Sequence, residues 1–167
     1  MHNIFVFDLD GTLVNTDSAN FYAYQEAIRE YKGINISVSQ NRFTRSDLEI
    51  LFPNIRQTEL KKIIELKEEC FKYYLKYTTP NTYFIEKLQE LSHNKQECIL
   101  LTSAHRRRAV ELLEYYNLKI YFTKMYFHED YNIVDYNKFS FLFSISKNKE
   151  IYTIYDNTFD TLTIKIL

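Results

Sequence analysis

Two carboxylates set two positions apart are the residues of this sequence best placed to do chemistry. Asp8 and Asp10 follow an apolar run, residues 4–7, with the length and residue types of a β-strand. Side chains alternate along a strand, so both carboxylates would lie on one side of an extended chain. Gly11 then allows a sharp turn. Burying two acids at a strand end is unfavourable unless they meet a cation or react, so the pair predicts a metal or catalytic site.

Other polar residues stand where a predicted strand ends or a predicted helix begins. Each has an ordinary structural explanation as a helix cap or a solvated charge. Their order along the chain and their places behind strands make them candidates for the same site. They are Thr102 and Ser103 after the apolar segment 99–101, Lys138 at a helix start, and Asp156 and Asp160 after the segment 151–154.

Residues 4–14, which include Phe-Asp-Leu-Asp-Gly-Thr-Leu-Val, resemble the first motif of the haloacid dehalogenase-like (HAD) superfamily. Members of this superfamily are mostly Mg-dependent phosphohydrolases. Thr102-Ser103, Lys138 and the acid pair Asp156 and Asp160 match its second, third and fourth motifs in order. The resemblance covers nearly the whole chain and is strongest to the capped phosphatase and beta-phosphoglucomutase-like subgroup.

The resemblance implies a division of catalytic roles. Asp8 would be the nucleophile that forms an aspartyl-phosphate. Asp10 would protonate the leaving oxygen and then activate water. The Thr102 hydroxyl and the Ser103 backbone N–H would bind the phosphoryl oxygens, and Lys138 would supply a positive charge to nucleophile and phosphate.

The resemblance also implies a Mg²⁺ site. Its ligands would be the Asp8 and Asp156 carboxylates and the Asp10 main-chain carbonyl, since Mg²⁺ prefers oxygen ligands in a near-octahedral shell. Asp160 would bind the metal through water or orient the shell. Thr12 would hold the loop that carries Asp10.

Substrate contacts are expected from two arginines between the first two helices of the segment 15–79. Arg42 and Arg45 could bind a second phosphate or a carboxylate, or be solvated surface residues. The position of Arg45 is similar to that of a substrate-gripping Arg in beta-phosphoglucomutase-like members. The run 106–108, three arginines beside the second motif, is interpreted as a solvated helix face.

The order of predicted elements favours an α/β fold. Short apolar strands alternate with amphipathic helices after residue 80, which predicts a Rossmann-like parallel sheet with helices on both faces. Residues 1–14 and 80–167 would form this HAD-like core, and the helical block 15–79 a small inserted cap. Helices are expected from the capping residues 15–17 as far as Gly33, from the cap Ser46-Asp47 through Phe52, and over 57–77, 82–94, 105–116, 137–147 and 159–166. Strands are expected over 4–7, 97–102, 120–127 and 151–155.

The sequence departs from the family at two points. Tyr155 stands where the fourth motif usually has Gly, and a bulky side chain there would crowd the metal or fill a different pocket. Few residues follow the fourth motif, so the chain is expected to be short at that end or to have no terminal strand there.

Composition excludes several classes of function. The 167 residues carry 21 Lys and Arg against 22 Asp and Glu, so nothing suggests nucleic-acid or membrane binding. Only two glycines occur, which removes support for a P-loop or a dinucleotide site. No signal peptide or membrane span is expected. Two cysteines without metal-type spacing suggest buried thiols in a reducing, cytoplasmic compartment.

The leading hypothesis is Mg-dependent hydrolysis of a small phosphomonoester, of the phosphoglycolate phosphatase-like kind, by a monomer or homodimer. A phosphomutase of the beta-phosphoglucomutase type would use the same aspartyl-phosphate on Asp8. A catalytically impaired binding module with the HAD fold is the third alternative.

Overall fold

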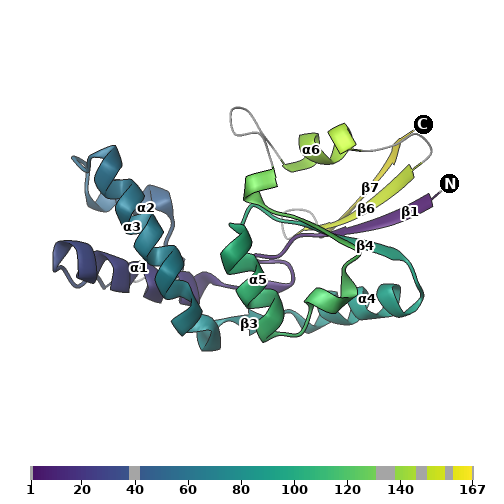
Figure 1. Cartoon of the computed structure of the whole chain (residues 1–167), viewed down its shortest axis with the longest axis horizontal. Helices are drawn as coiled ribbons and strands as arrows, with labels where there is room; N and C mark the ends of the chain where they lie inside the picture. The colour runs from purple at the N-terminus through teal and green to yellow at the C-terminus, as the bar shows by residue number, and fades with distance from the viewer. Residues whose placement is uncertain (1, 38–41, 131–137, 146–149, 157–159, 167) are drawn as a thin grey trace. The chain divides into compact units, whose positions relative to one another are not determined.

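The computed structural model describes the chain apart from residues 1, 38–41, 131–137, 146–149, 157–159 and 167 (Figure 1). The chain divides into two compact units. One comprises residues 1–14 and 80–167, and the other comprises residues 15–79. In the described residues no helix is long and apolar enough to span a membrane.

The first unit is built on a five-stranded sheet with the order β5-β4-β1-β6-β7. The four strands β5, β4, β1 and β6 run parallel, and β7 runs antiparallel to β6. The strands are β1 (His2–Phe7), β4 (Glu97–Leu101), β5 (Lys124–Tyr126), β6 (Glu150–Asp156) and β7 (Asp160–Ile166).

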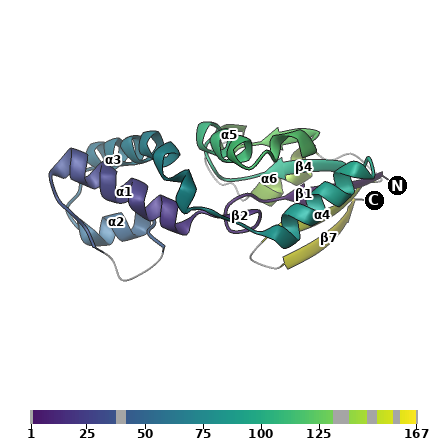
Figure 2. The same cartoon turned by 90° about the horizontal axis from the view of Figure 1, so that it is seen from below.

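Helices cover both faces of this sheet. Helices α4 (Thr82–His93) and α5 (Arg106–Tyr115) lie on one side, and α6 (Lys138–Ile145) lies on the other (Figures 1 and 2). Alternate residues of β1 point to opposite faces. Ile4 and Val6 pack with Leu142 of α6, whereas Phe7 packs on the α4 side. The continuous apolar strands are thus explained by burial on both faces.

The strand order creates a switch point beside β1. The chain passes from β1 through α4 to β4 on one side and returns through α6 to β6 on the other. Ligands in open α/β sheets bind beyond the carboxyl ends of the strands at such a point. The fold therefore predicts a ligand site at the carboxyl ends of β1, β4 and β6.

The second unit is helical and has a core of its own. The apolar faces of its helices meet around Ile28, Leu48 and Ile63, and Gly33 ends the first helix in the left-handed conformation with φ 68°. Two-residue strands, β2 (Val14–Asn15) and β3 (Thr79–Pro80), pair where the chain enters and leaves this unit. The helices are α1 (Asp17–Lys32), α2 (Arg45–Leu51), α3 (Gln57–Cys70) and the 3₁₀ helix η1 (Phe71–Tyr77).

The expected last helix is wrong. The segment 160–166 forms the edge strand β7, so a terminal strand is present, and the alternative in which it would be absent is wrong. Leu162, Ile164 and Ile166 alternate with polar residues, which is a strand pattern rather than a helical one. β-Branched residues and the pairing with β6 together outweigh the capping potential of Asp160.

Smaller differences concern where elements begin and end. The expected strand 120–127 is a 3₁₀ turn, η2 (Lys119–Tyr121), followed by the three-residue strand β5. The helix expected over 57–77 becomes 3₁₀ from Phe71. Helix α2 is capped by Thr44, which exchanges hydrogen bonds with Asp47, so the cap lies two residues before the expected Ser46.

The Tyr155 side chain packs in the core, whereas its neighbour Asp156 lies at the carboxyl end of β6. Its ring stacks on Phe7, with ring centroids 4.6 Å apart, and lies 6.0 Å from the Phe84 ring of α4. Burial raises the pKa of its hydroxyl. Cys98 is also buried, which raises the pKa of its thiol to about 11. Tyr155 therefore occupies a pocket of its own, as one of the two alternatives expected.

Replacing Tyr155 by alanine should lower the free energy of unfolding by about 3 kcal/mol, because it removes a large aromatic group from a packed core. Tyr155→Phe keeps the stacking and should change it by less than about 1 kcal/mol. Urea denaturation followed by near-ultraviolet circular dichroism measures both. Tyr115→Ala, at a half-exposed site, is the control. An equal loss in Tyr155→Ala and Tyr115→Ala would contradict this packing.

Candidate active site

Three buried polar residues stand at the ends of adjoining parallel strands. Asp8 directly follows β1, Thr102 directly follows β4, and Asp156 is the last residue of β6. Phe7 is paired with Leu100 on one side and Tyr155 on the other. This parallel register brings the three polar residues to the same carboxyl end of the sheet. Asp8 is 8% exposed, Thr102 1% and Asp156 2%.

A tight loop carries Asp10 away from the end of β1. Gly11 has a φ of 79° and its N–H donates to the Val14 carbonyl at 2.8 Å. A side chain at this position would be strained, which explains the glycine. The N–H groups of Leu13 and Val14 both donate to the Leu9 carbonyl, at 3.0 and 3.1 Å. The buried Thr12 lies within this loop, so burial and backbone hydrogen bonds together hold the chain around Asp10.

The second motif forms the connection from β4 to α5. The Thr102 N–H donates to the Tyr126 carbonyl at 3.1 Å, which continues the pairing with β5. The Ala104 N–H donates to Thr102 Oγ1 at 3.1 Å and so orients this hydroxyl group. Ser103 is exposed. Thr102 is thus held from both sides, while Ser103 faces solvent.

The other two motifs are described through their backbones. Lys138 is the first residue of α6, and Asp160 is the first residue of β7, where it pairs with Asp156. Both side chains lie outside the described part of the structure. The pairing puts Asp160 at the same end of the sheet as Asp156.

Arg42 and Arg45 belong to the helical unit. Arg42 Nε lies 3.9 Å from Asp17 Oδ1, and Arg45 Nε lies 3.4 Å from Glu49 Oε1 one helical turn away. Both side chains are mostly exposed. Ion pairs of this exposed kind contribute little to stability, so neither arginine is needed to hold the helices together.

Arg108 is not the solvated residue that was expected. Its guanidinium lies over Asp10, with Nη2 2.7 Å from Oδ2 and Nη1 3.3 Å from Oδ1. The expectation treated three arginines alike, although successive residues of a helix point in different directions. Arg108 lies one turn before the buried Leu112 on the same face, which is the signal that could have identified it.

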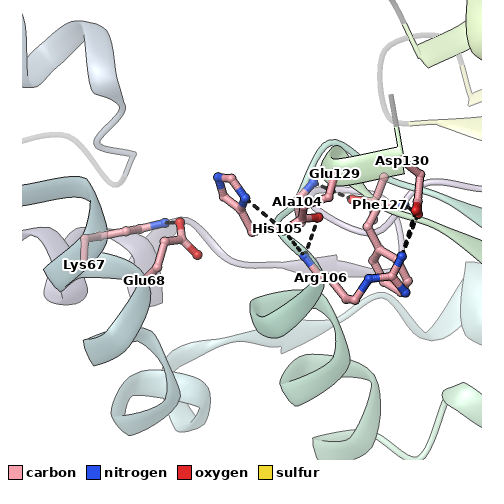
Figure 3. Close-up of polar contacts among 9 residues, drawn as sticks. Lys67, Glu68, Ala104, His105, Arg106, Phe127, Glu129 and Asp130 are labelled. Carbon is pink, nitrogen blue, oxygen red and sulfur yellow. Dashed lines mark hydrogen bonds and ion pairs between the residues drawn. The ribbon is translucent and has the colours of Figure 1, made fainter. Parts of the chain in front are cut away.

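A second polar cluster ties the start of α5 to the turn after β5 (Figure 3). Glu129 accepts hydrogen bonds from the Arg106 backbone N–H, at 3.1 and 3.0 Å, and pairs with His105 Nδ1 at 3.1 Å. Arg106 also holds both carboxylate oxygens of Asp130, at 2.8 and 3.0 Å, and lies over the Phe127 ring. Desolvation opposes ionisation of Glu129, but these hydrogen bonds lower its pKa overall.

The helical unit contains a buried cation of its own. Lys67 of α3 is 5% exposed, and its Nζ lies 2.9 Å from Glu68 Oε1 (Figure 3). The ammonium group lies 5.3 Å from the centre of the Tyr24 ring and 5.6 Å from that of Phe71. Lys67 follows Ile63 by one turn on the apolar face of α3. The helical spacing therefore indicates that Lys67 is buried.

The donor groups at the strand ends suit a magnesium ion. Asp8 and Asp156 supply two buried carboxylates on neighbouring strands, and Mg²⁺ sites typically use one or two carboxylates with carbonyl groups, waters and substrate oxygens. Among the described residues no three His, Cys, Asp or Glu side chains gather as a metal site. A site completed by a carbonyl, waters and a phosphate does not require a third such side chain.

Comparison with known proteins decides the family. The family model described as haloacid dehalogenase-like hydrolase matches residues 5–165, almost the whole chain. The chain belongs to this family. No curated protein sequence matches the chain significantly.

Solved structures of other HAD proteins share the fold. A haloacid dehalogenase-like hydrolase from Streptococcus pneumoniae is 16% identical, with a TM-score of 0.68, and the match covers 93% of this chain and 75% of that one. A protein assigned as a phosphoglycolate phosphatase from Lactobacillus plantarum is 15% identical, with a TM-score of 0.68 and coverage of 91% and 76%. A protein assigned as a beta-phosphoglucomutase from Thermotoga maritima is 23% identical, with a TM-score of 0.61 and coverage of 91% and 75%. The HAD fold is therefore established for this chain.

Proposed function

We propose that this HAD protein hydrolyses a small phosphomonoester in a Mg²⁺-dependent reaction through an aspartyl-phosphate on Asp8. The observation that carries the proposal is the meeting of Asp8, Thr102 and Asp156 at the ends of three adjoining parallel strands. Membership of the hydrolase family supports the same reaction class.

Asp8 is the proposed nucleophile. Its carboxylate oxygen attacks phosphorus and the bond to the leaving oxygen breaks, which produces an aspartyl-phosphate and an alcohol. Asp10 gives a proton to that leaving oxygen and takes one from the water that later attacks the aspartyl-phosphate. The tight loop around Gly11 holds the backbone on either side of Asp10 in place for this role.

Thr102, Ser103 and Lys138 are proposed to hold the phosphoryl group. The Thr102 hydroxyl, oriented by the Ala104 N–H, donates to a phosphoryl oxygen, and the Ser103 backbone N–H binds another. Lys138 at the start of α6 supplies a positive charge. Donors arranged in advance around developing negative charge are the main source of rate acceleration in phosphoryl transfer.

Mg²⁺ is the proposed cofactor. Asp8, Asp156 and the Asp10 carbonyl would hold it, with Asp160 acting through water or on the ligand shell. When bound, the ion offsets the repulsion between an anionic nucleophile and an anionic phosphate. Thr12 contributes by keeping the Asp10 loop closed.

The proposed substrate is a small phosphorylated metabolite of the phosphoglycolate class. The fold likeness to the Lactobacillus plantarum protein assigned as a phosphoglycolate phosphatase favours this choice. Arg42 and Arg45 are proposed to bind a second anionic group of the substrate, since both guanidinium groups are largely exposed and their ion pairs are weak.

A phosphomutase is the second candidate, favoured by the fold likeness to the Thermotoga maritima protein assigned as a beta-phosphoglucomutase. Both candidates form the same aspartyl-phosphate, but a mutase returns the phosphoryl group to a sugar instead of to water. Incubation with a β-hexose 1-phosphate separates them. Release of inorganic phosphate indicates hydrolysis, whereas formation of the 6-phosphate without release indicates a mutase.

Changing Asp8 to asparagine should reduce kcat with an aryl phosphate by at least about 10³-fold, because an amide is a poor nucleophile. Phosphate release in the presence of Mg²⁺ measures the effect, and a panel of phosphorylated metabolites then identifies the substrate. Glu90→Gln, at an exposed acid of α4, should keep wild-type activity. Activity that survives Asp8→Asn would eliminate Asp8 as the nucleophile. A wild type that binds metal but turns over no phosphate ester would favour the binding module.

Removing the metal with EDTA should abolish turnover, and added Mg²⁺ should restore it, because the nucleophile and phosphate are both anionic. Asp156→Asn should raise the Mg²⁺ concentration needed for half-maximal activity by about 10-fold or more, since it removes one carboxylate ligand. Titration of activity against Mg²⁺ measures this shift, with Glu90→Gln again as the control. An unchanged Mg²⁺ requirement would remove Asp156 from the ligand set.

A further inference from the structure

The strongest feature outside the assigned roles is the ion pair between Arg108 and Asp10. The two residues are 98 positions apart in sequence. Their contact joins the loop of the first motif to helix α5, and both belong to the sheet-containing unit. The Arg108 side chain is 11% exposed and that of Asp10 is 29% exposed. The pair is thus shielded on the arginine side and open to solvent on the aspartate side.

The three consecutive arginines of α5 have three different environments. Arg106 binds Asp130, away from the Asp10 loop. Arg107 is 57% exposed and its Nε lies 3.3 Å from Glu111 on its own helix. Arg108 faces inward to Asp10. Arg107 and Arg108 are therefore matched in charge, size and helix position, and differ in what they contact.

The geometry of the pair restrains the carboxylate. Two nitrogens of a planar guanidinium contact the two oxygens of Asp10, at 2.7 and 3.3 Å, so rotation of the carboxylate would break at least one contact. Lysine at this position would supply the charge without the fork. The loop around Gly11 orders the backbone of Asp10, and Arg108 adds order to its side chain.

We propose that Arg108 is a positioning residue that holds the Asp10 carboxylate for proton transfer. The inference rests on the proposed function, in which Asp10 acts as general acid and base. Proton transfer requires the carboxylate within hydrogen-bond reach of the leaving oxygen, and a displacement of about 1 Å can cost about 10²-fold in rate. Arg108 acts through Asp10, so its effect exists only while Asp10 carries out that transfer.

Three other roles for Arg108 make different predictions. A residue that binds the substrate directly would affect KM. A residue that sequesters Asp10 would slow the enzyme, so its removal would raise kcat. A residue that only stabilises the fold would act independently of Asp10. A double-mutant cycle with Asp10 separates these roles from positioning.

The experiment compares Arg108→Met, Arg108→Lys and Arg107→Met, each alone and combined with Asp10→Asn, using steady-state kinetics on an aryl phosphate. Arg108→Met should lower kcat about 10- to 100-fold with KM changed less than about 2-fold. Arg108→Lys should fall between Arg108→Met and wild type, and guanidinium ions should partly restore Arg108→Met. Arg107→Met should match wild type. In the Asp10→Asn background, Arg108→Met should cause no further loss.

Several results would overturn the inference. They are a KM effect without a kcat effect, a rise in kcat, and an equal loss from Arg108→Met with and without Asp10→Asn. Near-ultraviolet circular dichroism and the melting temperature identify an unfolded variant, and Arg108→Lys then carries the test. If wild type is active and needs Asp8 but Arg108→Met equals Arg107→Met, the inference alone fails. If wild type turns over no phosphomonoester, the proposed function fails and this inference with it.

Discussion

The parallel register of β4, β1 and β6 is the constraint on which the site depends. Pairing of Phe7 with both Leu100 and Tyr155 aligns the carboxyl ends of the three strands at one end of the sheet. A shift of one residue along β1 would turn Asp8 into the core and Phe7 towards the opposite face. Ile4 and Val6 pack into the core on the α6 side and Phe7 packs on the α4 side, so core packing and placement of the carboxylate depend on the same register.

The same alternation explains how a tyrosine is accommodated beside a candidate metal ligand. Tyr155 and Asp156 are neighbours on β6, so their side chains point to opposite faces of the sheet. The Tyr155 ring packs with Phe7 and Phe84, whereas Asp156 ends the strand at the candidate site. Tyr155, which departs from the family motif, is thus accommodated by core packing and need not alter the chemistry at the strand ends.

Helix α5 links two parts of the site region through arginines two positions apart. Arg106 anchors the turn after β5 through Asp130, and Arg108 contacts Asp10 in the loop after β1. Helical geometry separates the directions of these side chains, so one short basic run serves two separate contacts. Composition identifies such a run only as a charge cluster, because its partners come from segments far away in the sequence.

Local pattern determined most of the elements: apolar runs became β1, β4 and β6, and helical spacing with Gly33 determined α1. The motif order identified the HAD family, which the family match confirms. Tertiary structure decided what depends on distant partners. Pairing with β6 made 160–166 a strand, and packing of α5 brought Arg108 to Asp10. Periodicity records which face is buried, but the identity of the group across that face is set only when the chain folds.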